Sequence, residues 1–229
     1  MLRRFVLIGF MLCCSAPTLY AAENAAAIER VVAVKPDGSL VLSRSGNVVL
    51  ANILFPDAPR AEAWLAEHVL QQEIHVTVGE ADRYGRSQIS SDVAEKMLRD
   101  GVAVYYATED AIPANWKPME DAARTANRGV WADKNFVSTS ENAAQHVGKF
   151  RVVEGTITRI YEGKKETYLN FGDDWHSDFS ITIPGKVRRS MKAQLATIKP
   201  GDKLRVRGAI YEENGPMIKL MRADNIALR

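Results

Sequence analysis

The spacing of hydrophobic residues changes several times along the chain, and each change predicts the boundary of a structural element. Near the start of the globular part, short runs rich in valine, leucine and isoleucine are separated by the turn sequences Pro36-Asp37-Gly38 and Ser45-Gly46-Asn47. Farther on, residues 73–78 alternate between apolar and polar side chains, which is typical of a half-buried strand. The first runs predict three consecutive antiparallel strands, at residues 30–34, 39–43 and 48–54.

Three other segments carry apolar residues at helical spacing. Trp64, Leu65 and Val69 form the apolar side of the first segment. The other two segments are followed by glycines, Gly101 and Gly129, as expected where a helix ends. The predicted helices span residues 61–70, 93–99 and 118–127.

The chain beyond residue 149 returns to a β pattern. Five apolar runs, with a helix-like stretch at residues 187–198 between the third and the fourth, have the layout of an OB-fold barrel. The runs predict strands at residues 150–161, 167–171, 178–183, 203–211 and 216–221. We therefore expect a mainly β fold with helices (α+β), made of two OB-like β-barrel modules, the first with three helices.

The two modules are expected to be separated by a polar stretch that is poor in large apolar residues, residues 136–147. We accordingly place the first module at residues 28–133, a linker at 134–148 and the second, OB-fold-like module at 149–229.

The start of the chain has the pattern of a secretory signal peptide. Arg3 and Arg4 precede a short apolar stretch, and the small residues Ala21 and Ala22 follow it. The stretch is too short for a retained anchor that spans a bilayer. We expect residues 1–22 to be removed and the mature protein to be periplasmic or secreted, with no stable membrane insertion.

Both cysteines, Cys13 and Cys14, lie inside this predicted signal peptide. A lipoprotein signal is the less favoured alternative, because Leu12 rather than a small residue precedes Cys13. After removal of residues 1–22 the mature chain would contain no cysteine, which excludes disulfides, thiolate catalysis and cysteine metal sites.

The net charge of +2 for the whole chain conceals an asymmetry between its two parts. Residues 23–148 contain 12 basic and 18 acidic residues, a net charge of −6, whereas residues 149–229 contain 16 and 10, a net charge of +6. A polyanion is therefore expected to bind the second module.

The most distinctive motif of the first module is Asp82-Arg83-Tyr84-Gly85-Arg86. An arginine just past a glycine turn is placed to donate two hydrogen bonds to a phosphate. Farther along, the chain reads Glu120-x-x-x-Arg124-x-x-x-x-Gly129-Val130-Trp131. In this order the residues resemble the staphylococcal-nuclease-like (thermonuclease) family of secreted, calcium-dependent phosphodiesterases, over about residues 31–131.

This resemblance implies a catalytic role for Arg86 and, by alignment through Pro56, for Asp57 at the position of the water-orienting glutamate. It also places Tyr84 beside the nucleic acid. The family's second arginine falls on Val49.

The resemblance places the two calcium-binding aspartates at Leu54 and Ser39. Calcium prefers six to eight oxygen ligands, several of them carboxylates, and Leu54 offers none. The resemblance therefore implies a phosphodiesterase fold with a degenerate calcium and catalytic site. We expect no cofactor and no metal site, with calcium as the alternative that the resemblance leaves open.

The same residues also have structural interpretations. Arg86 could pair with Asp82 and anchor the loop, and Asp57 could cap the following helix. Glu120 and Arg124, four residues apart, are expected to pair along their helix, and Trp131 to lie in the core.

In the second module, aromatic and basic residues suggest a surface for single strands, which bind basic grooves with exposed aromatic rings. Lys203, Arg205 and Arg207 alternate with apolar residues and share one face of a strand. The same alternation would also describe an ordinary solvated face. The aromatic candidates are Tyr168 and Trp175, and a further basic cluster contains Lys186, Arg188, Arg189 and Lys192.

Three functions remain open from the sequence. The protein is an exported nuclease-family protein with weak phosphodiesterase activity, a degenerate relative that binds nucleic acid through its second module, or an envelope protein that uses both barrels as interaction scaffolds. The corresponding partners are single-stranded nucleic acid or another polyanion, and an envelope protein.

Overall fold

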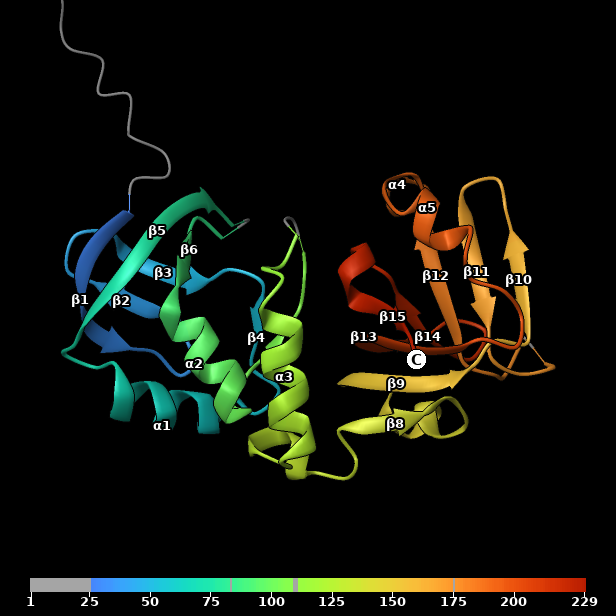
Figure 1. Ribbon diagram of the computed structural model, residues 1–229, viewed down its shortest axis with the longest axis horizontal. Helices are drawn as coiled ribbons and strands as arrows, with labels where there is room; N and C mark the ends of the chain where they lie inside the picture. Colours follow the sequence, from blue (N-terminus) through green and yellow to red (C-terminus); the bar gives the residue numbers. More distant parts are fainter. Residues whose placement is uncertain (1–25, 83, 109–110, 175) are drawn as a thin grey trace, which may run out of the picture.

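The computed structural model describes residues 26–82, 84–108, 111–174 and 176–229. The predicted signal peptide and Trp175 lie outside the described residues. Figure 1 shows two modules side by side, with α3 (Trp116–Thr125) at their boundary. Within the described part of the chain, no helix is long and apolar enough to cross a membrane.

Five strands of the first module close into a barrel in the order β1, β2, β3, β6, β5. The three strands expected at its start are confirmed as an antiparallel meander. Strand β6 was not predicted, because Ile89 is its single large apolar residue. The barrel strands are β1 (Ala26–Val34), β2 (Leu40–Leu42), β3 (Gly46–Leu50), β5 (Glu73–Ala81) and β6 (Ser87–Ser91).

The third predicted strand is shorter than expected, because the chain leaves the barrel after Leu50. Residues Ile53–Leu54 form β4, which pairs with β7 (Val104–Tyr105) in a separate two-stranded sheet. This small sheet lies outside the barrel path.

All three predicted helices are present, as α1 (Ala58–His68), α2 (Asp92–Asp100) and α3. Helix α2 ends at Gly101, whose positive φ of 69° suits a residue without a side chain. A Cβ on Gly101 would lie 2.4 Å from the carbonyl oxygen of Arg128, and one on Gly129 would lie 2.1 Å from that of Gly101. The two glycines therefore let the end of α2 pack directly against the chain that follows α3.

The second module is an eight-stranded sheet whose main path runs β10, β11, β12, β14, β13, β9, β8, with β15 paired to β13. The first predicted strand divides at Ile157 into two, and the helix between the third and fourth strands divides at Met191. The arrangement confirms an OB-like module. Its elements are β9 (Phe150–Thr156), β10 (Arg159–Glu162), β11 (Glu166–Asn170), β12 (Ser180–Pro184), α4 (Gly185–Ser190), α5 (Lys192–Leu195), β13 (Lys203–Glu212), β14 (Pro216–Lys219) and β15 (Ile226–Leu228).

The segment expected as a linker contains regular structure. Val137–Thr139 forms β8, which pairs in parallel with β9, and Ser140–His146 forms the 3₁₀-helix η2. Small and polar residues dominate this segment, so its composition resembles that of a linker although Ser138, Ser140 and Ala143 are buried.

The two modules share a hydrophobic cluster. Val104, Ala123 and Trp131 of the first module pack in one cluster with Phe136, which directly precedes β8, and with Val152 of the second module. Trp131 is buried, as the sequence predicted. We call this contact between the modules the seam, and its apolar part means that neither module would keep all of its core without the other.

Candidate functional site

Arg86 lies in a tight turn between β5 and β6. Gly85 adopts a positive φ of 75°, and Oδ1 of Asp82 accepts hydrogen bonds from the backbone nitrogens of Tyr84 and Arg86, both at 2.9 Å. The guanidinium of Arg86 donates through Nε to Oδ2 of Asp82 at 2.9 Å and through Nη1 to Oδ2 of Asp37 at 2.9 Å. The carboxylates of Asp82 and Asp37 therefore pair with Arg86, the arginine for which the family resemblance implies a catalytic role.

Asp37 is well suited to keep this partner. Hydrogen bonds from the side chain and backbone of Ser39 lower the pKa of Asp37, and the charge of Arg86 lowers it further. The hydroxyl of Ser39 donates to Oδ1 of Asp37 at 2.7 Å. Asp37 is consequently ionised at neutral pH and holds Arg86 in an ion pair.

The surroundings of this turn do not suit a calcium ion. Phe55 lies against Gly38, where an added Cβ would approach its ring to 2.3 Å, so an apolar ring fills this space. Leu54 pairs with β7, and Asp57 caps α1 by accepting a hydrogen bond from the nitrogen of Arg60 at 3.2 Å. In the part of the chain that the structure describes, no group of three or more histidine, cysteine or carboxylate side chains is placed to hold a metal ion.

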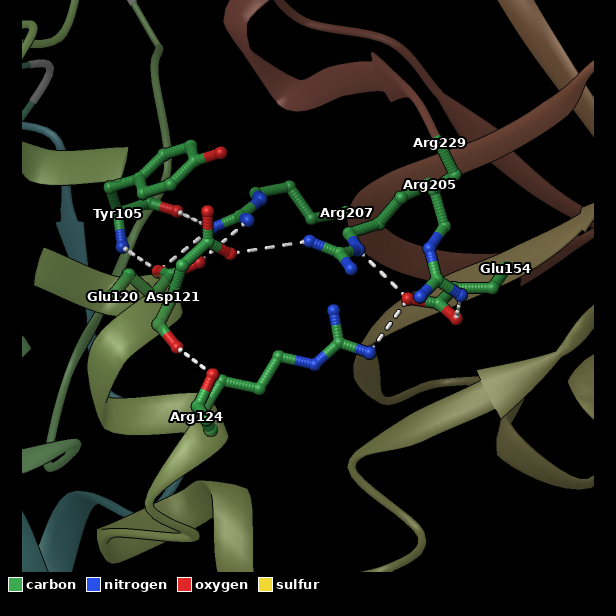
Figure 2. Close-up of polar contacts among 9 residues, drawn as sticks. Tyr105, Glu120, Asp121, Arg124, Glu154, Arg205, Arg207 and Arg229 are labelled. Atoms are coloured by element: carbon green, nitrogen blue, oxygen red, sulfur yellow. Dashed lines mark hydrogen bonds and ion pairs between the residues drawn. The ribbon is translucent and has the colours of Figure 1, made fainter. Parts of the chain in front are cut away.

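The seam contains a buried ion pair, drawn in Figure 2. Arg207 and Glu120 are each 3% exposed, and Arg207 donates through Nη2 to Oε1 and through Nη1 to Oε2 of Glu120, at 2.7 and 2.9 Å. Nη1 also donates to the carbonyl oxygen of Tyr105 at 2.9 Å. The guanidinium carbon of Arg207 lies 3.5 Å from the centroid of the Tyr105 ring.

The surroundings of Arg207 and Tyr105 keep the guanidinium charged and the phenol neutral. Burial by itself would lower the pKa of Arg207, but the charge and hydrogen bonds of Glu120 raise it above its ordinary value. Burial raises the pKa of Tyr105 to about 12, so its phenol stays neutral at physiological pH.

A second set of charges surrounds Glu154 at the edge of the seam (Figure 2). Its carboxylate accepts hydrogen bonds from Arg124 and Arg205, both at 2.8 Å, and from Arg229. Burial opposes its ionisation, yet the hydrogen bonds from Arg205 and Arg124 outweigh burial and lower the pKa of Glu154.

These contacts revise two expectations from the sequence. Glu120 and Arg124 do not pair along their helix, because each contacts a residue of the second module instead. Arg205 and Arg207 share a face with Lys203, as predicted, but the first module covers that face and supplies carboxylates to both arginines. Lys203 remains exposed.

A groove lies on the outer face of the second module, over β10, β11, β12 and β14 and the end of β13. It encloses about 660 Å³. Two rows of cross-strand neighbours line the groove. The first row consists of Arg159, Asn170, Ser180, Met217 and Tyr211, and the second consists of Tyr161, Tyr168, Thr182 and Lys219. The row between them is apolar and packs toward the core: Ile160, Leu169, Ile181, Ile218 and Ile210.

The groove combines aromatic walls with a polar floor. Tyr161 is 60% exposed, and its ring lies 6.3 Å from that of Tyr168, which donates its hydroxyl to Glu166 at 3.0 Å. On the floor, the hydroxyls of Thr182 and Tyr211 lie 3.4 Å apart. Of the sequence candidates that the structure describes, only Tyr168 lines this groove. The period-2 alternation of polar residues along β10 to β12 was the signal for the others.

Basic residues gather where the β10–β11 hairpin meets α4, near the top of the second module in Figure 1. Arg188 of α4 donates to the carbonyl oxygen of Gly163 at 3.0 Å, and Gly185 lies so close to the hairpin that a Cβ would be 2.9 Å from the carbonyl oxygen of Lys165. We call this group the basic end: Lys164, Lys165, Lys186, Arg188, Arg189 and Lys192. Among the residues described, none of the six is in an ion pair, in contrast to the arginines at the seam.

The family comparison concerns the module that bears the turn of Arg86. Residues 52–133 match the family model described as Staphylococcal nuclease homologue, so the first module contains a staphylococcal-nuclease-like domain. The resemblance drawn from the motifs is thereby confirmed.

The other comparisons add little. A search of curated proteins found no match. Among solved structures, the crystal structure of the S. pombe Stn1-ten1 complex is similar with 15% identity and a TM-score of 0.29, over 35% of this chain and 57% of that chain. A similarity this low supports no conclusion about the fold, which is established by the strand order.

Proposed function

We propose that this protein is an exported, non-catalytic relative of the staphylococcal-nuclease-like proteins, and that it binds single-stranded nucleic acid through its second module. The observation that carries the proposal is the state of Arg86. Its guanidinium is held by Asp37 and Asp82, so it has few donors left for a phosphate. Val49 supplies no second arginine, and Leu54 and Phe55 supply no calcium ligand.

Loss of this machinery removes most of what phosphodiester hydrolysis needs. Stabilising the developing oxyanion requires positioned cations, and removing one such donor costs about 2.7–4 kcal/mol, or roughly a hundred- to thousandfold in rate. The absence of a second arginine and of calcium ligands adds to this loss.

Binding, in contrast, is supported by the basic end. Its six cations lie at one end of the module without carboxylate partners among the described residues, and they adjoin the strands that form the groove. A cluster of unpaired cations attracts phosphates and releases counterions when it binds them.

Catalysis is tested with the mature protein, single-stranded DNA and RNA, and either calcium or a chelator. We expect no calcium-stimulated cleavage, and we expect Arg86→Ala to leave the background unchanged. Robust calcium-dependent hydrolysis that Arg86→Ala abolishes would show that the protein is an active nuclease.

Binding is tested by titrating a single-stranded oligonucleotide at increasing salt concentrations. The double variant Lys186→Ala/Arg189→Ala should weaken binding and flatten the dependence of log affinity on log salt by about two, one per lost phosphate contact. The matched control Lys35→Ala/Lys134→Ala removes the same charge from exposed positions elsewhere and should bind as the wild type does. If the wild type has no affinity at low salt, the nucleic-acid proposal fails and the envelope-scaffold hypothesis gains support.

Export is tested separately, by N-terminal sequencing of the protein from the periplasm or medium. We expect the mature chain to begin near Glu23. Retention of Met1 would contradict export by a cleaved signal peptide.

A further inference from the structure

The floor of the groove has polar side chains that are buried within the protein yet line an open cavity. Asn170, Ser180 and Thr182 are 8%, 3% and 3% exposed, and all three line the groove. The side-chain carbonyl oxygen of Asn170 accepts a hydrogen bond from Ser180 at 3.0 Å. Its amide nitrogen has no partner among the described residues. The amide nitrogen is therefore available to donate a hydrogen bond to a ligand in the groove, where a few placed polar groups fix the orientation of what binds.

The walls add aromatic surface. Tyr161 projects into solvent at the side of the groove, with Tyr168 as its cross-strand neighbour and Tyr211 at the far side. Tyrosine rings offer planar faces on which another planar ring can stack.

The charges of the groove lining balance. Arg159 and Lys219 are matched by Glu166 and Glu213, so the groove has no surplus cation for a phosphate. The surplus lies at the basic end, and residues 163–165 connect β10 directly to β11 there. A neutral planar group therefore suits the groove, and the anionic part of the same ligand suits the basic end.

We infer that the groove receives an unstacked nucleobase from a single strand whose phosphates lie along the basic end. Tyr161 and Tyr168 contact the face of the base, and Asn170, with the hydroxyls of Thr182 and Tyr211, hydrogen-bonds its edge. This inference rests on the proposed function. It implies preference for single strands, because the stacked and paired bases of a duplex present neither a free face nor a free pairing edge.

The test compares an ordinary single-stranded oligonucleotide with an abasic strand of equal length and charge, using the full chain. Stacking of even one base predicts that the abasic strand binds about tenfold more weakly at the same salt concentration. Both strands should show the same salt slope, since their phosphates contact the same cations.

Variants locate the effect. Tyr161→Ala, at an exposed position, should reduce the advantage of the base-bearing strand and leave the salt slope unchanged, whereas Tyr161→Phe should retain the advantage. Asn170→Ala should also reduce it, with thermal unfolding measured to verify that the variant is folded.

The outcomes separate the two proposals. Equal affinity for both strands, with a steep salt dependence, would overturn the nucleobase site and leave the proposed function standing. Absence of binding to either strand would overturn both. An advantage of the base-bearing strand that survives in Tyr161→Ala and Asn170→Ala would place the base elsewhere and overturn this assignment of the groove.

Discussion

The second module has two polar surfaces built by the same strand alternation, and they differ in what covers them. At the seam, Arg205 and Arg207 contact carboxylates of the first module and of β9. At the groove and the basic end, the first module does not cover the polar side chains, which line an open cavity or lie at the surface. The contrast shows that a row of arginines on one face of a strand can serve the interior of a protein as well as a ligand.

The charge asymmetry between the two parts of the chain acquires a different meaning from this comparison. From the sequence alone, the net charge of +6 of residues 149–229 favours binding of a polyanion. In the structure, Arg207 is matched by Glu120 and Arg205 contacts Asp121, both from the acidic part. Some of the opposite charges of the two parts thus form ion pairs between the modules. The cations of the basic end are the ones that remain for a partner.

The largest effect is expected at the seam. Arg207→Ala leaves Glu120 buried without its partner, which should lower the free energy of unfolding by about 3–5 kcal/mol. Chemical denaturation of the full chain measures this, with Lys203→Ala as a control on the same strand and the same face. A loss no greater than that of the control would contradict the structural role of the pair.

Replacing both partners sharpens this prediction. A double variant with apolar residues at 120 and 207 should be less destabilised than either single variant, because no uncompensated charge remains buried. Equal or greater destabilisation of the double variant would contradict this explanation.

A smaller effect, dependent on pH, is expected at Glu154. Because its pKa in the folded protein is lowered from 4.5, its ionised form stabilises the fold above that pH, and the contribution is lost as the pH falls through the folded value. Glu154→Gln should be less stable than the wild type at neutral pH by about 1.5–3 kcal/mol, and the difference should shrink in acid. Denaturation series at several pH values test this, and a pH-independent difference would contradict it.

The smallest effect is expected at the turn of Arg86. Since Arg86 pairs with partly exposed carboxylates, Arg86→Ala should change stability less than Glu154→Gln does. Its affinity for single strands should equal that of the wild type if binding belongs to the second module. A large loss of affinity in Arg86→Ala would place the binding surface on the first module and contradict the assignment of binding to the basic end.

The sequence predicted elements well where a local signal existed. Leu204 and Val206 face the core, Asp57 caps α1, and the helix after Ser91 ends at Gly101 because these features depend on neighbours within a few residues. Strands β6 and β8 were missed, since their small polar residues lie in sheets that only distant strands complete.

For the candidate site, the sequence alone shows only where this chain departs from the pattern that the family resemblance implies. Val49 and Leu54 stand where the family resemblance implies an arginine and an aspartate, and this comparison needs no knowledge of the fold. That Arg86 is held by Asp37, 49 residues away, required the barrel to bring the β1–β2 turn and the β5–β6 turn together.

The sequence by itself therefore determined the strands and helices that have a clear hydrophobic period, and which side of each is apolar. The tertiary structure decided which polar side is covered. Arg207 meets Glu120 across 87 residues, and the groove exists because four strand pairings align Asn170 with Ser180 and Tyr161 with Tyr168. The physical reason is that periodicity records contact with the core of the same module, whereas the partners of a polar face are set by long-range packing that no local pattern records.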